Sequence, residues 1–137
     1  MESVTLTYGT FDLFHIGHLN LLERAASLGL PLYVGVSTEM FNAAKGKESV
    51  VPFEERCRIV KALKCVKEVF PEDSWIQKAE DIQRFSAKIL VMGSDWEGKF
   101  DTYLSLCSVK YFPRTEAVST TEIRRRTASL YRGPGVS

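Results

Sequence analysis

The two histidines of this 137-residue chain, His15 and His18, lie only three residues apart. They follow an apolar stretch, Val4 to Tyr8, and open an amphipathic helical pattern, Leu19 to Leu28. Both imidazoles therefore lie at a predicted helix N-terminus, where unpaired backbone N–H groups and the helix dipole already favour an anion. Gly17 between them lets the backbone approach a ligand closely. This pattern predicts a phosphate site, and a triphosphate is the ligand that it favours.

Two other interpretations of the histidine pair stay open. A histidine at a helix start can simply cap the helix, and histidines at i and i+3 can hold a metal ion. Zinc needs further nitrogen or sulfur ligands, and no nearby cysteine or third histidine supplies one. We therefore expect no metal ligands from the protein and favour phosphate binding.

Lys45 and Lys47 flank Gly46 in a predicted loop ahead of Pro52. Lysines in loops usually do no more than stay hydrated, and that interpretation is open here. A lysine also acts well as a movable point charge on a phosphate, and loops of this kind often close over a substrate. We favour phosphate contacts for both lysines.

A second helix N-terminus is predicted after Arg114. Ser119 and Glu122 have the spacing of a capping box, in which each side chain bonds a free backbone N–H of the first turn. Capping leaves Thr120, Thr121 and the Arg114 guanidinium, whose planar fork suits phosphate oxygens. We expect these three side chains to bind phosphate.

Five short runs rich in β-branched or aromatic residues predict buried strands. They are Val4 to Tyr8, Leu32 to Val36, Val66 to Phe70, Ile89 to Met92 and Val109 to Phe112. Helical patterns alternate with them: 18–28 ending at Gly29, Pro52 at N1 to about Leu63, Trp75 to Phe85, Thr102 to Leu106, and Thr120 to about Leu130. This alternation predicts an α/β fold with a Rossmann-like, doubly wound, parallel five-stranded sheet.

Ligands of such sheets bind beyond the carboxyl ends of the strands, near a switch in strand order. Segments with glycine, hydroxyl or charged residues follow four of the predicted strands, at 9–12, 37–47, 93–96 and 113–121. In the third of these, Asp95 and Trp96 are placed to point into a cleft. We therefore expect the functional residues to converge at this one edge of the sheet.

Length and composition fit an ordinary globular chain, with 45% hydrophobic residues, 26% charged residues and a net charge of +1. We expect one domain over residues 1–131 and a flexible tail over 132–137. The charge balance gives no reason to expect a nucleic-acid or membrane partner. Cys57, Cys65 and Cys107 form no Cys-x-x-Cys pair, and Met1 to Ser3 open no leader-like segment. We therefore expect a cytoplasmic protein.

The segment Tyr8 to His18 resembles the opening of the nucleotidyltransferase superfamily, whose cytidylyltransferase branch carries Gly-Thr-Phe-Asp followed by His-x-Gly-His. Three further blocks, at 45–47, 93–101 and 114–121, follow in the order and spacing of the bacterial glycerol-3-phosphate cytidylyltransferases. The resemblance covers about residues 3 to 125, and its last block is the most family-specific part. There the chain has Ala117 where the family usually has glycine.

This resemblance implies roles for residues on both sides of a reaction. The nucleotide contacts that it implies are Thr10, Phe11, His15, Gly17, His18, Lys47, Asp95, Arg114, Thr115, Ser119, Thr120 and Thr121. The acceptor contacts are Lys45, Trp75 and Lys78, the last two in a Trp-x-Gln-Lys spacing that the family shares. Catalysis is expected from His15, His18, Lys45 and Arg114.

Structural interpretations stay open for several of these positions. Trp75 and Lys78 can be a core aromatic beside a surface charge on one helical face. Asp12 can be a cap or turn residue. Arg56, on the predicted Pro52 helix, either points into the cleft or is a solvated helix charge. Asp95 either reads the base or braces neighbouring backbone.

The resemblance implies cytidylyl transfer from CTP to sn-glycerol 3-phosphate, which gives CDP-glycerol and pyrophosphate. A phosphate monoester is already largely dianionic at neutral pH, so the attacking group needs no general base. We expect direct in-line attack on the α-phosphorus, without a covalent enzyme intermediate. Mg²⁺ is expected to accompany the triphosphate, and the resemblance also implies a homodimer.

Two alternatives to this activity remain at this point. The acceptor can be another small phosphate, such as a sugar phosphate or phosphoethanolamine, because the fold would be the same. The chain can also be a non-catalytic nucleotide-binding regulator, and Ala117 is the main argument for it. If the glycine of the family adopts a positive φ, alanine strains or shifts the loop.

Overall fold

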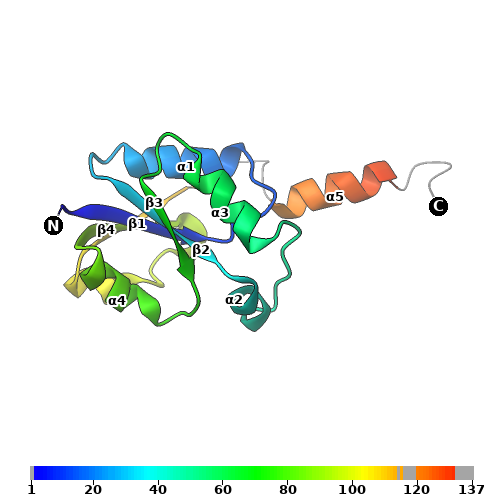
Figure 1. The fold of residues 1–137 in the computed structure, drawn as a ribbon. Coiled ribbons are helices and arrows are strands. Elements are labelled where there is room, and N and C mark those ends of the chain that lie inside the picture. Colours follow the sequence, from blue (N-terminus) through cyan, green and yellow to red (C-terminus); the bar gives the residue numbers. More distant parts are fainter. Residues whose placement is uncertain (1, 114, 116–119, 132–137) are drawn as a thin grey trace.

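The core of the protein is a parallel sheet, seen in a computed structural model that describes residues 2–113, 115 and 120–131 (Figure 1). In pairing order its strands are β3 (Glu68–Glu72), β2 (Leu32–Ser37), β1 (Val4–Gly9), β4 (Ala87–Gly93) and β5 (Ser108–Phe112). All four strand pairs are parallel. The order changes direction between β1 and β4, so the switch point lies beyond Gly9 and Gly93. The expected Rossmann-like α/β fold is confirmed.

Helices cover both faces of this sheet. The helices that the structure describes are α1 (Ile16–Ala26), α2 (Glu39–Ala44), α3 (Phe53–Lys61), α4 (Gln77–Arg84), the 3₁₀ helices η1 (Ser94–Trp96) and η2 (Asp101–Ser105), and α5 (Thr120–Tyr131). On one face, Leu22 of α1 and Val60 of α3 share a buried apolar cluster with the strands. On the other face, Ile82 of α4 and Phe100 ahead of η2 share a second cluster. The sheet is therefore wound on both sides, as Figure 1 shows.

The last helix, α5, projects away from the sheet at the end where the strands finish (Figure 1). Its first residue is tied to the body, because the Thr120 hydroxyl donates to the Asp12 carbonyl at 2.9 Å. Within the described part of the chain, no helix combines the length and the apolar character needed to cross a membrane.

The third strand differs from its prediction. It was expected at residues 66–70 but runs from Glu68 to Glu72. Pro71 lies inside it, which is possible because β3 is at the edge of the sheet, where one ladder N–H can be spared. The shift of two residues brings Glu72 to the carboxyl edge, where ligands of such sheets bind.

Four helices also begin at other residues than expected, among them η2, which runs from Asp101 to Ser105 and not from Thr102 to Leu106. The first starts at Ile16 and ends at Ala26, so that Gly29, with φ +97°, lies in the turn beyond it. Pro52 is the N-cap of α3 and not its first helical residue. The fourth starts at Gln77, so Trp75 precedes it.

The short helix α2 was not predicted, since residues 37–47 were interpreted as a loop. Thr38 caps this helix, because its Oγ1 accepts a hydrogen bond from the Phe41 N–H at 3.1 Å. Three expectations lie outside the described residues: the capping box from Ser119, the strain at Ala117 and the tail at 132–137.

Candidate active site

A cavity of about 580 Å³ opens where the five strands end. This volume lies in the range of small-molecule sites, about 300–1,000 Å³. The expected site residues that the structure describes all line it: Thr10, Phe11, His15, Gly17, His18, Lys45, Lys47, Trp75, Lys78, Asp95, Thr115, Thr120 and Thr121. Arg114 and Ser119 lie outside the described residues. The parallel sheet thus brings together segments that are far apart in the chain.

The histidine pair caps helix α1. Nδ1 of His15 accepts a hydrogen bond from the Gly17 N–H at 3.0 Å, and Nδ1 of His18 accepts one from the His15 N–H at 3.2 Å. Together they form a reciprocal capping box, with the two rings stacked at 3.9 Å between centroids. A ring nitrogen that accepts carries no proton, so each neutral imidazole holds its proton on Nε2. The capping interpretation is therefore correct, and it fixes the tautomers.

Capping is compatible with phosphate binding by His18. Burial lowers the pKa of His18 to about 4, and the neighbouring His15 acts in the same direction. At neutral pH the ring is uncharged, with Nδ1 engaged in the cap and Nε2–H on its opposite edge. That edge can donate one oriented hydrogen bond to a phosphate oxygen of a ligand in the cavity.

Gly17 is required by the cap itself. A Cβ at this position would lie 2.8 Å from Cε1 and 3.0 Å from Nδ1 of the His15 ring. Real Cβ atoms do not approach another side chain so closely, so any larger residue must displace the capping ring. The glycine therefore serves the position of His15 directly, besides leaving the backbone open to a ligand.

Asp12 is a structural residue of the turn between β1 and α1. Its carboxylate accepts the N–H groups of Leu13 at 3.1 Å, Val50 at 2.8 Å and Val51 at 2.9 Å. It also forms an ion pair with Arg124 of α5 at 2.7 Å. Burial alone would raise the pKa of Asp12, but the bonds from Val50 and Val51 and the Arg124 guanidinium hold it below its usual value. One carboxylate thus joins the turn, the segment before α3 and helix α5.

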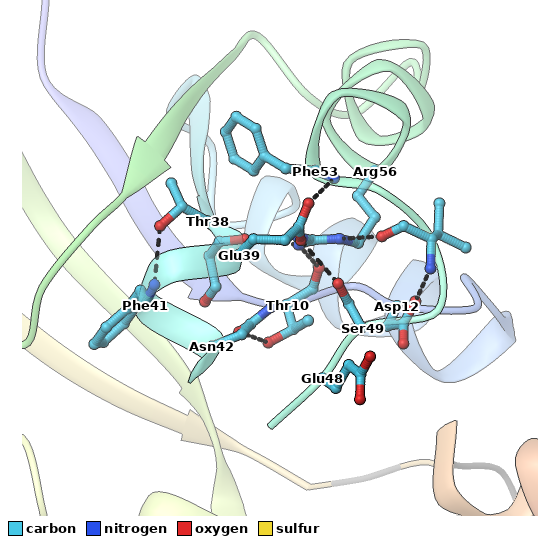
Figure 2. Close-up of polar contacts among 12 residues, drawn as sticks. Thr10, Asp12, Thr38, Glu39, Phe41, Asn42, Glu48, Ser49, Phe53 and Arg56 are labelled. Atoms are coloured by element: carbon cyan, nitrogen blue, oxygen red, sulfur yellow. Dashed lines mark hydrogen bonds and ion pairs between the residues drawn. The ribbon is translucent and has the colours of Figure 1, made fainter. Parts of the chain in front are cut away.

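Arg56 lies behind the cavity, and neither interpretation from the sequence was right. Its side chain is 0% exposed. The guanidinium donates to the carbonyl oxygens of Thr10 at 2.8 Å, Ser37 at 2.7 Å and Val51 at 2.8 Å. It also pairs with Glu39 at 2.5 Å, and Figure 2 shows it reaching from α3 into this group. Arg56 therefore holds the ends of β1 and β2 to α2 and to the segment before α3.

The two lysines of the predicted loop have different surroundings. Lys45 is the C-cap of α2 and is half-buried, and its ammonium donates to the Ser37 hydroxyl at 3.0 Å. Burial lowers the pKa of Lys45 to about 8, although the charge of Glu72 opposes this shift. Lys47 is exposed at the cavity rim, with its backbone N–H bonded to the Asn42 carbonyl at 2.8 Å. Lys45 is therefore held in the cavity wall, whereas the Lys47 ammonium reaches solvent.

Lys78 is a buried cation, not the surface charge of the simpler interpretation. Its side chain is 1% exposed and pairs with Glu72 at 2.7 Å. The second carboxylate oxygen of Glu72 accepts from the Ser37 hydroxyl at 2.9 Å. The Trp75 ring centroid lies 5.6 Å from the Lys78 ammonium. The proximity of Trp75 and Lys78 was predicted correctly, but Trp75 precedes α4 and does not share a helical face with Lys78.

The remaining expected contacts lie round the cavity mouth. Thr115 Oγ1 accepts a hydrogen bond from the Asn20 amide at 3.0 Å, which ties Thr115 to α1. Thr121 is exposed in the first turn of α5, next to Thr120. Asp95 is exposed on η1, at the end of β4. Hydroxyl and carboxylate groups therefore border the opening on the β4 and β5 side.

Of the charged residues that line the cavity, sequence reasoning missed Glu48, Glu72 and Arg124. Glu72 could have been found by extending the third strand across Pro71, because its carboxyl end must meet the same edge as the others. Arg124 lies four residues after Thr120, on the same side of a helix already expected to reach the site. Its contact with Asp12 could not be predicted from spacing.

Comparisons with known proteins show what the whole chain is similar to. Residues 6–126 match the family described as cytidylyltransferase-like. The chain is 50% identical over 125 residues to a glycerol-3-phosphate cytidylyltransferase of Bacillus spizizenii, covering 91% of this chain and 97% of that protein. It is 44% identical to the enzyme of the same name from Staphylococcus aureus, covering 88% and 91%. The crystal structure of a lipopolysaccharide core biosynthesis protein from Thermoplasma volcanium shares the fold, with a TM-score of 0.71, 19% identity, and coverage of 86% and 100%.

Proposed function

Because the chain belongs to the cytidylyltransferase-like family, we propose that it transfers the cytidylyl group of CTP to sn-glycerol 3-phosphate, giving CDP-glycerol and pyrophosphate. One observation carries this proposal. The capped N-terminus of α1, with its two imidazoles, and the buried Lys78–Glu72 pair line the same cavity. A nucleoside triphosphate and a second phosphate can therefore meet there. The names of the relatives support this choice of substrates.

The reaction is a direct in-line displacement. An oxygen of the acceptor phosphate forms a bond to the α-phosphorus of CTP, and the bond from that phosphorus to the oxygen bridging to the β-phosphate breaks. Pyrophosphate leaves with the electron pair, and no proton has to be removed from the dianionic acceptor. His15, His18 and Arg114 stabilise the charge on the α-phosphoryl group and the leaving pyrophosphate. Lys45 holds the acceptor phosphate.

These groups are sufficient in magnitude. Correct alignment of two bound reactants can supply about 7–11 kcal/mol of the barrier. Each preorganised donor to developing charge adds about 3 kcal/mol. The other nucleotide contacts proposed here are Thr10, Phe11, Gly17, Lys47, Asp95, Thr115, Ser119, Thr120 and Thr121, with Trp75 and Lys78 on the acceptor side.

Mg²⁺ would be held mainly by the triphosphate of CTP. Over the residues that the structure describes, no group of three or more His, Cys, Asp or Glu side chains could hold a metal ion. Mg²⁺ commonly keeps several waters and binds through substrate phosphates, with one or two carboxylates. Glu48 and Asp95 line the cavity and could supply such a carboxylate. The metal would neutralise charge on the β- and γ-phosphates.

Three further properties are part of the proposal. Residues 1–131 form one functional domain, and 132–137 act as a tail. The protein works as a homodimer, which light scattering after gel filtration would test. It acts in the cytoplasm, a reducing compartment compatible with the free thiols of Cys57, Cys65 and Cys107.

Pyrophosphate release tests the activity directly. Four nucleoside triphosphates are combined with sn-glycerol 3-phosphate, a sugar phosphate and phosphoethanolamine, with and without Mg²⁺. We expect turnover with CTP and sn-glycerol 3-phosphate, and its loss with EDTA. Turnover with ATP and not CTP, or with another acceptor only, would replace this proposal by the alternative acceptor class. CTP binding without pyrophosphate release from any acceptor would indicate a regulator.

A further inference from the structure

Three aromatic rings surround the ammonium group of Lys78. The Lys78 Nζ atom lies 4.4 Å from the Tyr8 ring centroid, 5.2 Å from that of Phe100 and 5.6 Å from that of Trp75. Glu72 completes this group, with a carboxylate oxygen 2.7 Å from the same nitrogen. We call Tyr8, Trp75, Phe100 and Glu72 the aromatic cage. All four of its residues line the cavity.

The chain's second lysine in this region extends the same arrangement. The Lys45 Nζ atom lies 4.3 Å from the Phe41 ring and 5.7 Å from the Trp75 ring. Phe41 and Trp75 contact each other edge to face at 5.2 Å, and Trp96 connects Trp75 to the Phe100 ring at 5.8 and 5.7 Å. Trp75, Trp96 and Phe100 line this end of the cavity, and Phe41 packs behind Trp75. Two ammonium groups of the protein itself therefore lie among these rings.

Such a set of rings with a carboxylate is the kind of site that recognises ammonium ligands. The electron-rich faces of aromatic rings attract cations, and cages of this composition bind choline and methylated lysine. In this protein the place of such a ligand is taken by a side chain. Lys78 is 1% exposed, so its ammonium fills the cage and does not only lie at its mouth.

We propose that Lys78 sets the acceptor class by filling this cage with its own ammonium, which excludes phosphate esters that carry an ammonium group and leaves room for neutral polyol phosphates. The inference rests on the proposed function, because it concerns the acceptor of that reaction. It assigns Lys78 a role in rejecting competitors, beyond holding the acceptor.

The same group favours a polyol. An ammonium has three N–H donors, and one of those of Lys78 is directed to Glu72. The other two N–H donors of Lys78 suit hydroxyl oxygens of the acceptor. The ammonium group of a competing acceptor would instead be repelled by the like charge of Lys78, and the rings that could attract it already contact a cation. Rejection by an unfavourable contact is an effective way to gain specificity.

A matched pair of acceptors isolates the charge. Phosphoethanolamine and 2-hydroxyethyl phosphate differ only in an ammonium in place of a hydroxyl. We expect the wild type to prefer the hydroxyl compound in kcat/KM by at least about 30-fold, the factor that a desolvated cation–π contact of about 2 kcal/mol represents. Equal use of both compounds by a wild type active with sn-glycerol 3-phosphate would overturn the inference but not the proposed function.

Variants of Lys78 test the cause. In Lys78→Met, kcat/KM for phosphoethanolamine and phosphocholine should rise in absolute terms by at least about tenfold, and that for sn-glycerol 3-phosphate should fall. A merely structural role would lower all values together, and that result would overturn the inference. Lys78→Arg keeps the charge and should keep the rejection. Lys61→Met, which removes an exposed lysine paired with Glu68 at 3.1 Å, is the matched control and should change no ratio.

Stability provides a readout that does not depend on activity. Lys78→Met leaves Glu72 buried without its cation, so ethylammonium chloride should raise the melting temperature of this variant more than sodium chloride does at equal ionic strength. The wild type should show no such difference. If Lys78→Met does not fold, the double variant Lys78→Met/Glu72→Gln removes both buried charges. Phosphocholine should then raise the melting temperature of the double variant, because the three aromatic rings of the cage remain. No rise in either folded variant would overturn the inference.

Discussion

His15 and His18 show how two roles can be separated at the scale of one residue. The Nδ1 atoms cap α1 through bonds of 3.0 and 3.2 Å, and a cap of this kind is worth about 1 kcal/mol. A preorganised donor to a charged transition state is worth about 3 kcal/mol in the barrier. The cap therefore contributes to the stability of the fold, whereas the donor contributes to the rate of turnover, and the second contribution is the larger.

Replacement of His18 should separate the roles. Glutamine at this third helical position can still accept the N-cap N–H, as in an ordinary capping box, but it loses the Nε2 donor. We expect His18→Gln to keep its stability while kcat falls by about 10²–10³ and the Kd for CTP changes little. His18→Ala should show the same kcat and lose about 1 kcal/mol of stability as well. Full turnover in His18→Gln would mean that His18 only caps the helix.

Gly17→Ala should give loss of turnover without loss of stability. Alanine improves helix propensity by up to about 1 kcal/mol, which offsets a lost cap of similar size. Its Cβ would lie 2.8 Å from the His15 ring, which must move. Gly29→Ala is a control with the opposite expected result. Its φ is +97°, which alanine adopts only with strain, and no atom lies within 4 Å of the added Cβ. Stability should therefore fall while turnover should not. Urea unfolding and kcat measured on both variants check this, and equal patterns would contradict it.

At the scale of elements, the cavity is held open by two charged side chains that lie behind it. Arg56 ties the ends of β1 and β2 to α2, and Asp12 ties the turn after β1 to α5. Each satisfies backbone groups that no neighbouring strand can reach, since the strands have ended. These two residues therefore fix the distance between the histidine pair and the lysines.

Loss of the Arg56 guanidinium should destabilise the protein strongly. Arg56→Met keeps an apolar stem but leaves the buried carbonyls of Thr10 and Ser37 unpaired, at about 1–3 kcal/mol for each unsatisfied group. For these two groups we expect a total loss of about 2–6 kcal/mol in urea unfolding. Arg58→Met, on the exposed side of the same helix, should change stability by less than about 0.5 kcal/mol. Equal losses in both variants would show that Arg56 does not join these elements.

At the scale of the whole molecule, the alternation of apolar runs with helical patterns was enough to predict a parallel sheet, with a cavity at the carboxyl ends of its strands. The local sequence pattern did not predict elements whose bounds depend on residues distant in sequence. Pro71 can stay in β3 only because that strand is at the edge, and edge position depends on the crossovers. The six residues of α2 are too few for a periodic signal, so only its Thr38 cap could have indicated it.

The sequence predicted which residues line the cavity better than it predicted their contacts. Spacing placed both histidines at a helix start, but two bonds to backbone N–H groups make them caps as well. The burial of Arg56 and Lys78 could not be predicted, since burial of a long charged side chain depends on partners distant in sequence. Those partners are carbonyl groups at strand ends for Arg56 and Glu72 of β3 for Lys78.

Acid should destabilise the whole molecule through His18. Burial holds its folded pKa at about 4, below the ordinary 6.5, so the unfolded chain binds the proton more tightly. The stabilising contribution is complete above about pH 6.5 and is lost as pH falls towards 4, by about 2 kcal/mol between pH 7 and pH 5. Burial tends to raise the pKa of Asp12 and Glu39, but hydrogen bonds lower both, so their contributions are lost only at more acidic pH.

Urea unfolding of wild type and His18→Gln at pH 7 and pH 5 measures this contribution. The wild type should lose about 2 kcal/mol more than the variant, because glutamine cannot take up a proton. That loss is a large part of the 5–15 kcal/mol that stabilises a typical domain. A parallel loss in both proteins would place the acid sensitivity in other groups. It would also mean that the His18 ring is protonated in the folded protein at pH 5, contrary to its role as an acceptor in the cap.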